Sequence, residues 1–168
     1  TMIVKPSEQT PIQDFIMAEI FEQVGLPPGV FNLVTGTGTE VGHAMCSHVD
    51  VDMVSFTGST GAGVCVSQAA APTIKRVALE LGGKSPMILT QDCDINAATA
   101  YATKNVTINT GQTCTALTRL LAPASRYEEI VQLLKTKFEQ VNIGDPMAQE
   151  TDMGPMCSAR QLASVQSY

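Results

Sequence analysis

Cys114 ends a polar, loop-like segment, residues 109–114, with the sequence Asn-Thr-Gly-Gln-Thr-Cys. Glu80 opens a second unusual string, residues 80–86, with the sequence Glu-Leu-Gly-Gly-Lys-Ser-Pro. A thiolate that attacks a carbonyl carbon needs a second group to handle protons, and the two groups need not be close in the sequence. The thiol and the carboxylate, each in glycine-rich surroundings, are therefore a candidate nucleophile and base.

The setting of Cys114 differs from that of a packing cysteine, for which the apolar run Gly-Val-Cys-Val around Cys65 is typical. Free cysteine is nevertheless among the residue types most often buried in protein cores. The residues alone therefore leave two interpretations of Cys114 open, a reactive thiol and an ordinary buried one.

Two glycine-rich turns could bind a phosphate, residues 36–42 (Gly-Thr-Gly-Thr-Glu-Val-Gly) and 58–63 (Gly-Ser-Thr-Gly-Ala-Gly). Each follows an expected strand and opens an expected helix, where free backbone N–H groups and the helix dipole favour an anion. Ser59 adds a hydroxyl donor to the second turn, whereas the glycines of the first miss the GxGxxG spacing by one residue. A tight turn without a ligand explains either turn alone, but two such turns in one sheet favour a nucleotide.

Lys5 and Glu8 follow the first expected strand, at the carboxyl edge where open parallel sheets bind their ligands. A lysine and a glutamate at that edge could hold the hydroxyl groups of a ribose. An exposed charged loop is the alternative interpretation of the same two residues.

The elements that must position these residues alternate between strand and helix. Strands are expected at residues 2–4, 30–34, 53–57, 75–81, 86–90 and 117–122. Helices are expected from Pro11, capped by Thr10, to Gly25, after Gly38 to Cys46, after Gly58 to Ala71, and over 94–107, 125–141 and 158–168. This alternation with short loops indicates an α/β fold in which helices cover a parallel sheet, with a domain boundary near Gly82 and Gly83.

Composition excludes several other classes of protein. The net charge of −6 argues against nucleic acid as a partner, because phosphate binding needs clustered lysine and arginine. The sequence has no run of 18 apolar residues, so no transmembrane helix is predicted. Five irregularly spaced cysteines without a CxxC pair, together with only two histidines, predict free thiols in the cytoplasm, with neither a disulfide framework nor a metal site.

Four segments resemble motifs of the aldehyde dehydrogenase superfamily, in that family's order and at its spacings. They are residues 5–11 (Lys-Pro-Ser-Glu-Gln-Thr-Pro), 56–60 (Phe-Thr-Gly-Ser-Thr), 80–86 and 109–114. The resemblance covers nearly the whole chain, and the last two motifs are highly specific. It implies a modified Rossmann-like dinucleotide-binding domain over residues 1–82 and the start of a second α/β domain, which carries the nucleophile, over 83–168.

The resemblance also implies which residues bind the cofactor, NAD or alternatively NADP. Lys5 and Glu8 match positions that hold the adenosine ribose. Residues 58–63 match the pyrophosphate turn, from Gly58 to Gly63, with Ser59 at the phosphate. A preference for NAD is expected, because Glu8 could accept hydrogen bonds from the 2′-hydroxyl and would repel a 2′-phosphate.

Three further residues complete the implied cofactor site. Gly38 and Phe56 match residues that line the adenine and nicotinamide clefts, and the backbone of Leu81 matches one that meets the nicotinamide amide. One departure is Gly61, where the family usually carries a larger residue, often glutamate.

By the same resemblance, Cys114 is the nucleophile and Glu80 the general base. The implied reaction oxidises a small-molecule aldehyde to a carboxylic acid through a thiohemiacetal and a thioester on the cysteine, with Glu80 activating the hydrolytic water. The backbone N–H of Cys114 could donate to the oxyanion. Two alternatives are a sibling enzyme that transfers the acyl group to coenzyme A, against which Glu80 weighs, and an inert fragment or binding protein that kept the fold.

Both ends of the chain resemble cut ends, since residues 1–4 read as a strand in progress and residues 158–168 as a helix without a stop signal. We therefore expect an internal segment of a longer, homo-oligomeric enzyme. The family's oxyanion-hole asparagine and the glutamate at the nicotinamide ribose would lie outside residues 1–168. Expressed alone, the segment is expected to fold poorly and to lack activity.

Overall fold

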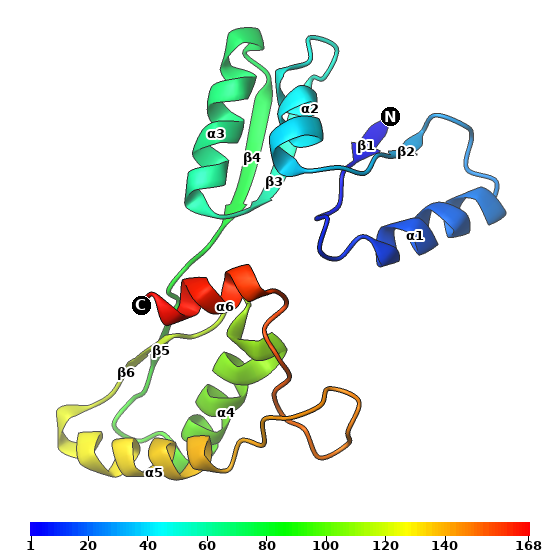
Figure 1. The fold of residues 1–168 in the computed structure, drawn as a ribbon. Helices are drawn as coiled ribbons and strands as arrows, with labels where there is room; N and C mark the ends of the chain where they lie inside the picture. Colours follow the sequence, from blue (N-terminus) through cyan, green and yellow to red (C-terminus); the bar gives the residue numbers. More distant parts are fainter. The chain divides into compact units, whose positions relative to one another are not determined.

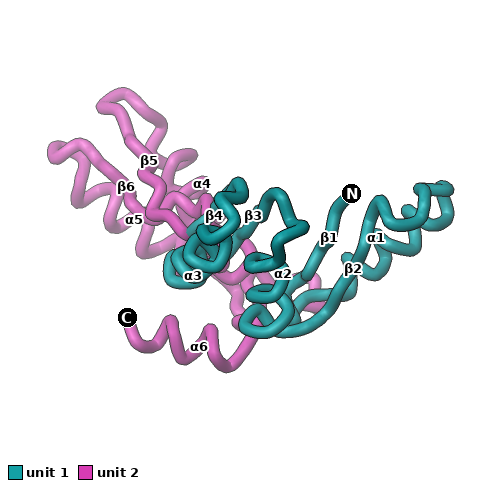
Figure 2. Tube along the Cα trace, turned by 90° about the horizontal axis from the view of Figure 1, so that it is seen from above, with its two compact units in different colours: residues 1–81 teal, residues 82–168 magenta.

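The computed structural model describes residues 1–168, which form two compact units, residues 1–81 and 82–168 (Figure 2). The division falls one residue before the boundary expected after Gly82. All strand pairs in both units are parallel. The predicted α/β class with parallel strands is thus confirmed.

The first unit alternates strands and helices along the chain (Figure 1). Its elements are β1 (Met2–Val4), α1 (Ile12–Gln23), β2 (Phe31–Leu33), the π-helical turn η1 (Gly38–Gly42), α2 (His43–Ser47), β3 (Met53–Gly58), α3 (Thr60–Ala70), the 3₁₀ turn η2 (Ala71–Thr73) and β4 (Arg76–Leu81). The expected third helix therefore ends one residue early, and the expected second helix begins as a π turn.

The second unit continues the same alternation. Its elements are β5 (Pro86–Ile88), α4 (Ile95–Thr107), the 3₁₀ turns η3 (Ile108–Gly111) and η4 (Ala124–Arg126), β6 (Arg119–Leu121), α5 (Tyr127–Glu139) and α6 (Ala159–Gln166). Both strands of this unit are shorter than expected, because only the paired core of each apolar run joins the ladder.

The two ends of α1 show one correct and one wrong cap prediction. Thr10 does not cap the helix: the cap position is Pro11, one residue later, and no side chain accepts a hydrogen bond from the first turn. Gly25 does end the helix, with φ of +77°, and its N–H donates to the carbonyl of Glu22. A left-handed glycine with this bond is the usual way to satisfy the last carbonyls of a helix.

The buried side of α1 is not its most apolar side. Half-buried Asp14, Ala18 and Phe21 follow one another at helical spacing, and the ring of Phe21 packs edge-on against Phe31 of β2 with centroids 4.9 Å apart. Five larger apolar residues, also at helical spacing, are exposed: Ile12, Phe15, Ile16, Ile20 and Val24. Within residues 1–168, only the side of α1 that carries Asp14, Ala18 and Phe21 is partly buried.

The sheet of the first unit consists of two separate ladders, where the sequence predicted one sheet. β1 pairs with β2, and β3 pairs with β4, but no hydrogen bonds join β1 to β3. Residues of β1 and β3 instead line a common hollow of about 540 Å³. The hollow runs along both strands, since its lining includes residues 1–5 and 52–56.

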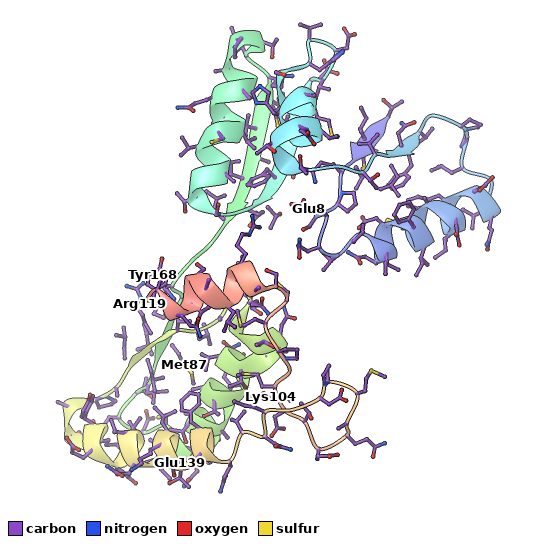
Figure 3. The ribbon with its side chains drawn as sticks, viewed as in Figure 1. Glu8, Met87, Lys104, Arg119, Glu139 and Tyr168 are labelled. Carbon is purple, nitrogen blue, oxygen red and sulfur yellow. The ribbon has the colours of Figure 1, made fainter.

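The second unit has a compact apolar core. Leu89, Ile95 and Ile130 are buried together, and Met87 of β5 packs against them on the side of α4 (Figure 3). Asp94 caps α4, since its Oδ1 accepts hydrogen bonds from the N–H groups of the first turn. This core fixes α4, whose last turn leads into the segment that carries Cys114.

None of the helices has the length and apolar character needed to cross a membrane.

Candidate active site

Lys5 and Glu8 lie together beyond the carboxyl end of β1 (Figure 3 labels Glu8). The Lys5 ammonium donates to the carbonyls of Pro6, at 2.6 Å, and Gly36, at 3.0 Å, and lies 3.8 Å from the Glu8 carboxylate. The lysine side chain is 14% exposed, whereas that of Glu8 is 44% exposed. Lys5 thus ties the end of β1 to the turn after β2, and Glu8 keeps acceptor capacity for a ligand.

The turn after β2 is built around Thr37 and Gly36. The Thr37 hydroxyl accepts from the N–H of Glu40 and donates to its carboxylate, 2.9 Å away. Gly36 has φ of +149°, and a Cβ there would lie 2.4 Å from the side chain of Val41, so only glycine fits. Gly38, by contrast, is exposed with no atom near its missing Cβ. Packing therefore does not require glycine at position 38, and the space beside the turn is open there.

The turn between β3 and α3 brings together Phe56, Gly58 and Ser59. A Cβ on Gly58 would lie 2.5 Å from the Phe56 ring, so the ring covers the glycine. The Ser59 Oγ accepts a hydrogen bond from the N–H of Ala62 at 3.2 Å and so caps α3. Its hydroxyl hydrogen remains available to a phosphate, because the cap uses only an oxygen lone pair. Gly61 has open space, so the larger family residue would fit here.

Leu81 and Gly63 join α3 to the edge of β4. A Cβ on Gly63 would lie 2.9 Å from a methyl of Leu81, which means that the buried glycine lets the helix approach the strand closely. Leu81 therefore faces α3, and the neighbouring Glu80 faces the opposite side of the strand. Glu80 pairs in register with Thr57, is exposed, and has no hydrogen-bond or ion-pair partner.

Cys114 lies in an exposed turn of the second unit, so the interpretation as an ordinary buried thiol is wrong. Its backbone N–H makes no hydrogen bond, while the following Ala116 N–H donates to the carbonyl of Thr113. Leu117 is held in turn by its N–H, which donates to the Asn105 side chain of α4 at 2.7 Å. The turn thus offers a thiol and a free donor side by side.

The segment before Cys114 is held by hydrogen bonds that the sequence did not reveal. Thr110 donates to the carbonyls of Gly154 and Pro155, and the Gln112 side chain accepts from the N–H of Cys157. The polar composition of residues 109–113 was the only signal for this network. Its partners are main-chain atoms, which nearly every residue type carries, so the sequence does not show where they lie.

The remaining cysteines differ from Cys114 in burial or setting. Cys46 is buried; burial raises the pKa of its thiol, and the charge of Lys75 opposes part of that rise. Cys65 is exposed, contrary to its apolar frame, because Gly63 and Ala70 define the buried face of α3 and Cys65 lies off that face. A raised pKa lowers the thiolate fraction, so Cys46 is a poor nucleophile at neutral pH.

Within the first unit, the predicted cofactor residues lie just after β1, at the ends of β3 and β4, on the turns that follow β2 and β3, and in the first turn of α3. They are Lys5, Glu8, Gly38, Phe56, Gly58, Ser59, Gly63 and Leu81. Glu80 belongs to this unit and Cys114 to the other. No group of three or more histidine, cysteine, aspartate or glutamate side chains is arranged to hold a metal ion.

The model of the aldehyde dehydrogenase family matches residues 1–168. A curated relative, a 3-succinoylsemialdehyde-pyridine dehydrogenase of a Pseudomonas species, is 49% identical over 166 residues, which cover 99% of this chain and 35% of the relative.

Two solved structures have the same fold. One is an aldehyde dehydrogenase of Pseudomonas syringae, carrying the substitution C291A, with NAD+ and octanal (45% identity, TM-score 0.95, 99% of this chain and 34% of that chain). The other is a betaine aldehyde dehydrogenase of Staphylococcus aureus with NAD+ (36% identity, TM-score 0.97, 100% and 33%). The chain thus spans about a third of the length of the proteins that it matches.

The cap at Ser59 predicts a local effect of substitution. In the whole protein, Ser59→Ala is expected to weaken the first turn of α3 by about 1 kcal/mol, because the Ala62 N–H loses its acceptor. Hydrogen exchange of peptides that cover residues 60–66 should then be roughly fivefold faster. Ser59→Asp keeps a capping oxygen and serves as the control, with near-native exchange. Equal acceleration in both variants would contradict the assigned cap.

Proposed function

The chain belongs to the aldehyde dehydrogenase family, and from this membership we propose that the whole protein oxidises an aldehyde to a carboxylic acid with NAD as the cofactor. The observation that carries the proposal is the exposed Cys114 thiol beside its own unbonded N–H. A nucleophile next to a donor suits attack on a carbonyl, since the donor can receive the negative charge that develops on the oxygen.

The first unit supplies groups that fit a dinucleotide. Glu8, paired with the anchored Lys5, keeps acceptor capacity for ribose hydroxyls, and Ser59 has a free hydroxyl hydrogen at the start of α3 for a phosphate. Open space at Gly38 and the Phe56 ring over Gly58 suit the flat ends of such a molecule. The main chain of Leu81 would bind the nicotinamide amide.

The proposed chemistry begins at Cys114. Its thiolate attacks the aldehyde carbon, and the resulting oxyanion accepts a hydrogen bond from the Cys114 N–H. Bound NAD would supply the hydride acceptor, and loss of the hydride from the carbon would leave a thioester on Cys114. Glu80 then removes a proton from the water that attacks the thioester, which releases the carboxylic acid and regenerates the thiol.

Transfer of the acyl group to coenzyme A is the second candidate reaction. That reaction needs no water-activating base, so the unpartnered carboxylate of Glu80 favours hydrolysis. NADH release that depends on added coenzyme A would favour the second candidate.

Replacement of the nucleophile tests the proposal directly. In the whole protein, Cys114→Ala is expected to abolish aldehyde oxidation and to leave NAD binding intact, as measured by NADH formation and by calorimetry. Cys65→Ala is the matched control, since Cys65 is also exposed but lies outside the proposed site. Near-native turnover of Cys114→Ala would overturn the proposal.

Replacement of the proposed base should separate the two chemical steps. Glu80→Gln is expected to preserve acylation and to slow deacylation, because only the second step needs the carboxylate. Rapid mixing should then show a burst of one NADH per site, followed by a slow steady rate. Equal loss of the burst would mean that Glu80 has another role.

The Glu8 carboxylate should govern the choice between NAD and NADP. Glu8→Gln keeps the shape but removes the charge, and a repulsion of about 1 kcal/mol at a hydrated site corresponds to a roughly fivefold change. We therefore expect the ratio of kcat/KM for NADP to that for NAD to rise about fivefold. An unchanged ratio, or a preference for NADP in the unaltered protein, would refute this role of Glu8.

A further inference from the structure

Three consecutive residues before Cys114 have left-handed backbone conformations. Asn109, Thr110 and Gly111 have φ of +53°, +57° and +72°. Glycine and asparagine tolerate this region, but a β-branched residue such as threonine is a true outlier there. Such conformations persist only where the surroundings hold them, and they cluster at functional sites.

The group that holds Thr110 comes from far along the chain. Its hydroxyl lies 3.2 Å from the carbonyl oxygen of Gly154 and 3.3 Å from that of Pro155. No hydrogen bond from the hydroxyl to its own turn competes with these. The unfavourable conformation therefore directs the Thr110 side chain to residues 154–155.

Gln112 makes a second connection, and it uses both ends of its side-chain amide. Its Nε2 donates to the carbonyl of Asn109 at 3.2 Å, while its Oε1 accepts from the N–H of Cys157 at 3.3 Å. The Asn109 side chain donates in return to the Gln112 carbonyl at 3.1 Å. These bonds close a ring around the strained residues and join it to Cys157.

Residues 154–157 are themselves fixed at both ends. Before them, Met153 pairs with Ile143, and the Gly144 N–H donates to the Met153 carbonyl. After them, Ser158 caps α6 by accepting from the N–H of Gln161. The segment can therefore act as a rigid support for whatever it contacts.

We propose that residues 154–157 clamp the turn that carries Cys114, and that Thr110 and Gln112 are positioning residues that fix the direction of its thiol and N–H. The clamp holds the turn two residues before Cys114, and the bonds of Ala116 and Leu117 hold it just after. The cysteine thus lies between two fixed points. This inference rests on the proposed function of Cys114 as the nucleophile.

The test uses the whole protein and six variants, at Thr110, Gln112, Thr118 and Cys157. Thr110→Val removes the hydroxyl but keeps the branched shape, and Thr110→Ser restores the hydroxyl. Gln112→Met removes both hydrogen bonds of the side-chain amide, and the milder Gln112→Glu keeps the oxygen that accepts from the Cys157 N–H. Thr118→Val is the control, because Thr118 is exposed and its hydroxyl makes no hydrogen bond.

Two measurements distinguish positioning from simple stabilisation. The first is kcat and KM for aldehyde oxidation, where misplacement of about 1 Å can cost up to about 100-fold. We expect Thr110→Val and Gln112→Met to lower kcat by about tenfold to 100-fold with little change in KM. The second is the pH profile of Cys114 alkylation by iodoacetamide without cofactor or aldehyde, followed by mass spectrometry, which should shift in both variants.

Thr110→Ser and Thr118→Val should match the unaltered protein in both measurements. Gln112→Glu should give values between those of the unaltered protein and Thr110→Val, and it replaces Gln112→Met if that variant does not fold. A lower melting temperature with unchanged kcat and alkylation profile would overturn the proposal. The alkylation profile does not depend on turnover, so it tests the clamp even if the proposed oxidation fails. Cys157→Ser keeps the N–H and should change neither measurement; a loss would overturn the main-chain role of Cys157.

Discussion

The first unit depends on the six-residue parallel ladder between β3 and β4. Its register pairs Thr57 with Glu80 and Gly58 with Leu81, so both strands reach the same edge of the sheet together. Parallel pairing requires a crossover helix, and α3 fits closely against β4 because Gly63 has no side chain. The capped start of α3 and the Glu80 carboxylate are thereby brought to neighbouring strand ends. A slip of one residue would turn Glu80 toward α3 and Leu81 away from it.

The second unit differs, because its proposed nucleophile, Cys114, lies in a turn and not at a strand end. The core around Leu89, Ile95 and Ile130 fixes α4, and Asn105 of α4 then holds the main chain beyond Cys114. An exposed thiol would otherwise share the mobility of its loop. Conformational strain at Thr110 is tolerated here because long-range hydrogen bonds oppose it. Burial stabilises the scaffold, and polar contacts set the geometry at the cysteine.

Local signals in the sequence predicted the elements well and their partners poorly. Gly25 ends α1 as predicted, because a left-handed glycine is itself a local signal, whereas the cap that Ser59 forms on α3 was not predicted. Thr10 is not the cap because the cap position falls one residue later, at Pro11, which has no hydroxyl to accept from the first turn. The most apolar side of α1 is exposed, since periodicity cannot say whether a face is covered, and Asp14, Ala18 and Phe21 are half-buried instead. The bonds of Gln112 were out of reach, because main-chain partners have no residue type.

The contact between Gln112 and Cys157 has a consequence for how this region can vary in evolution. The glutamine accepts from a backbone N–H, which every residue except proline provides. This hydrogen bond therefore restricts the residue type at position 112, whereas at position 157 it excludes only proline. Pairs of positions that vary together would not reveal the contact, since one partner leaves no chemical trace in the alignment. A hydrogen bond between a side chain and a main-chain N–H can thus restrict the residue type at one position and not at the other.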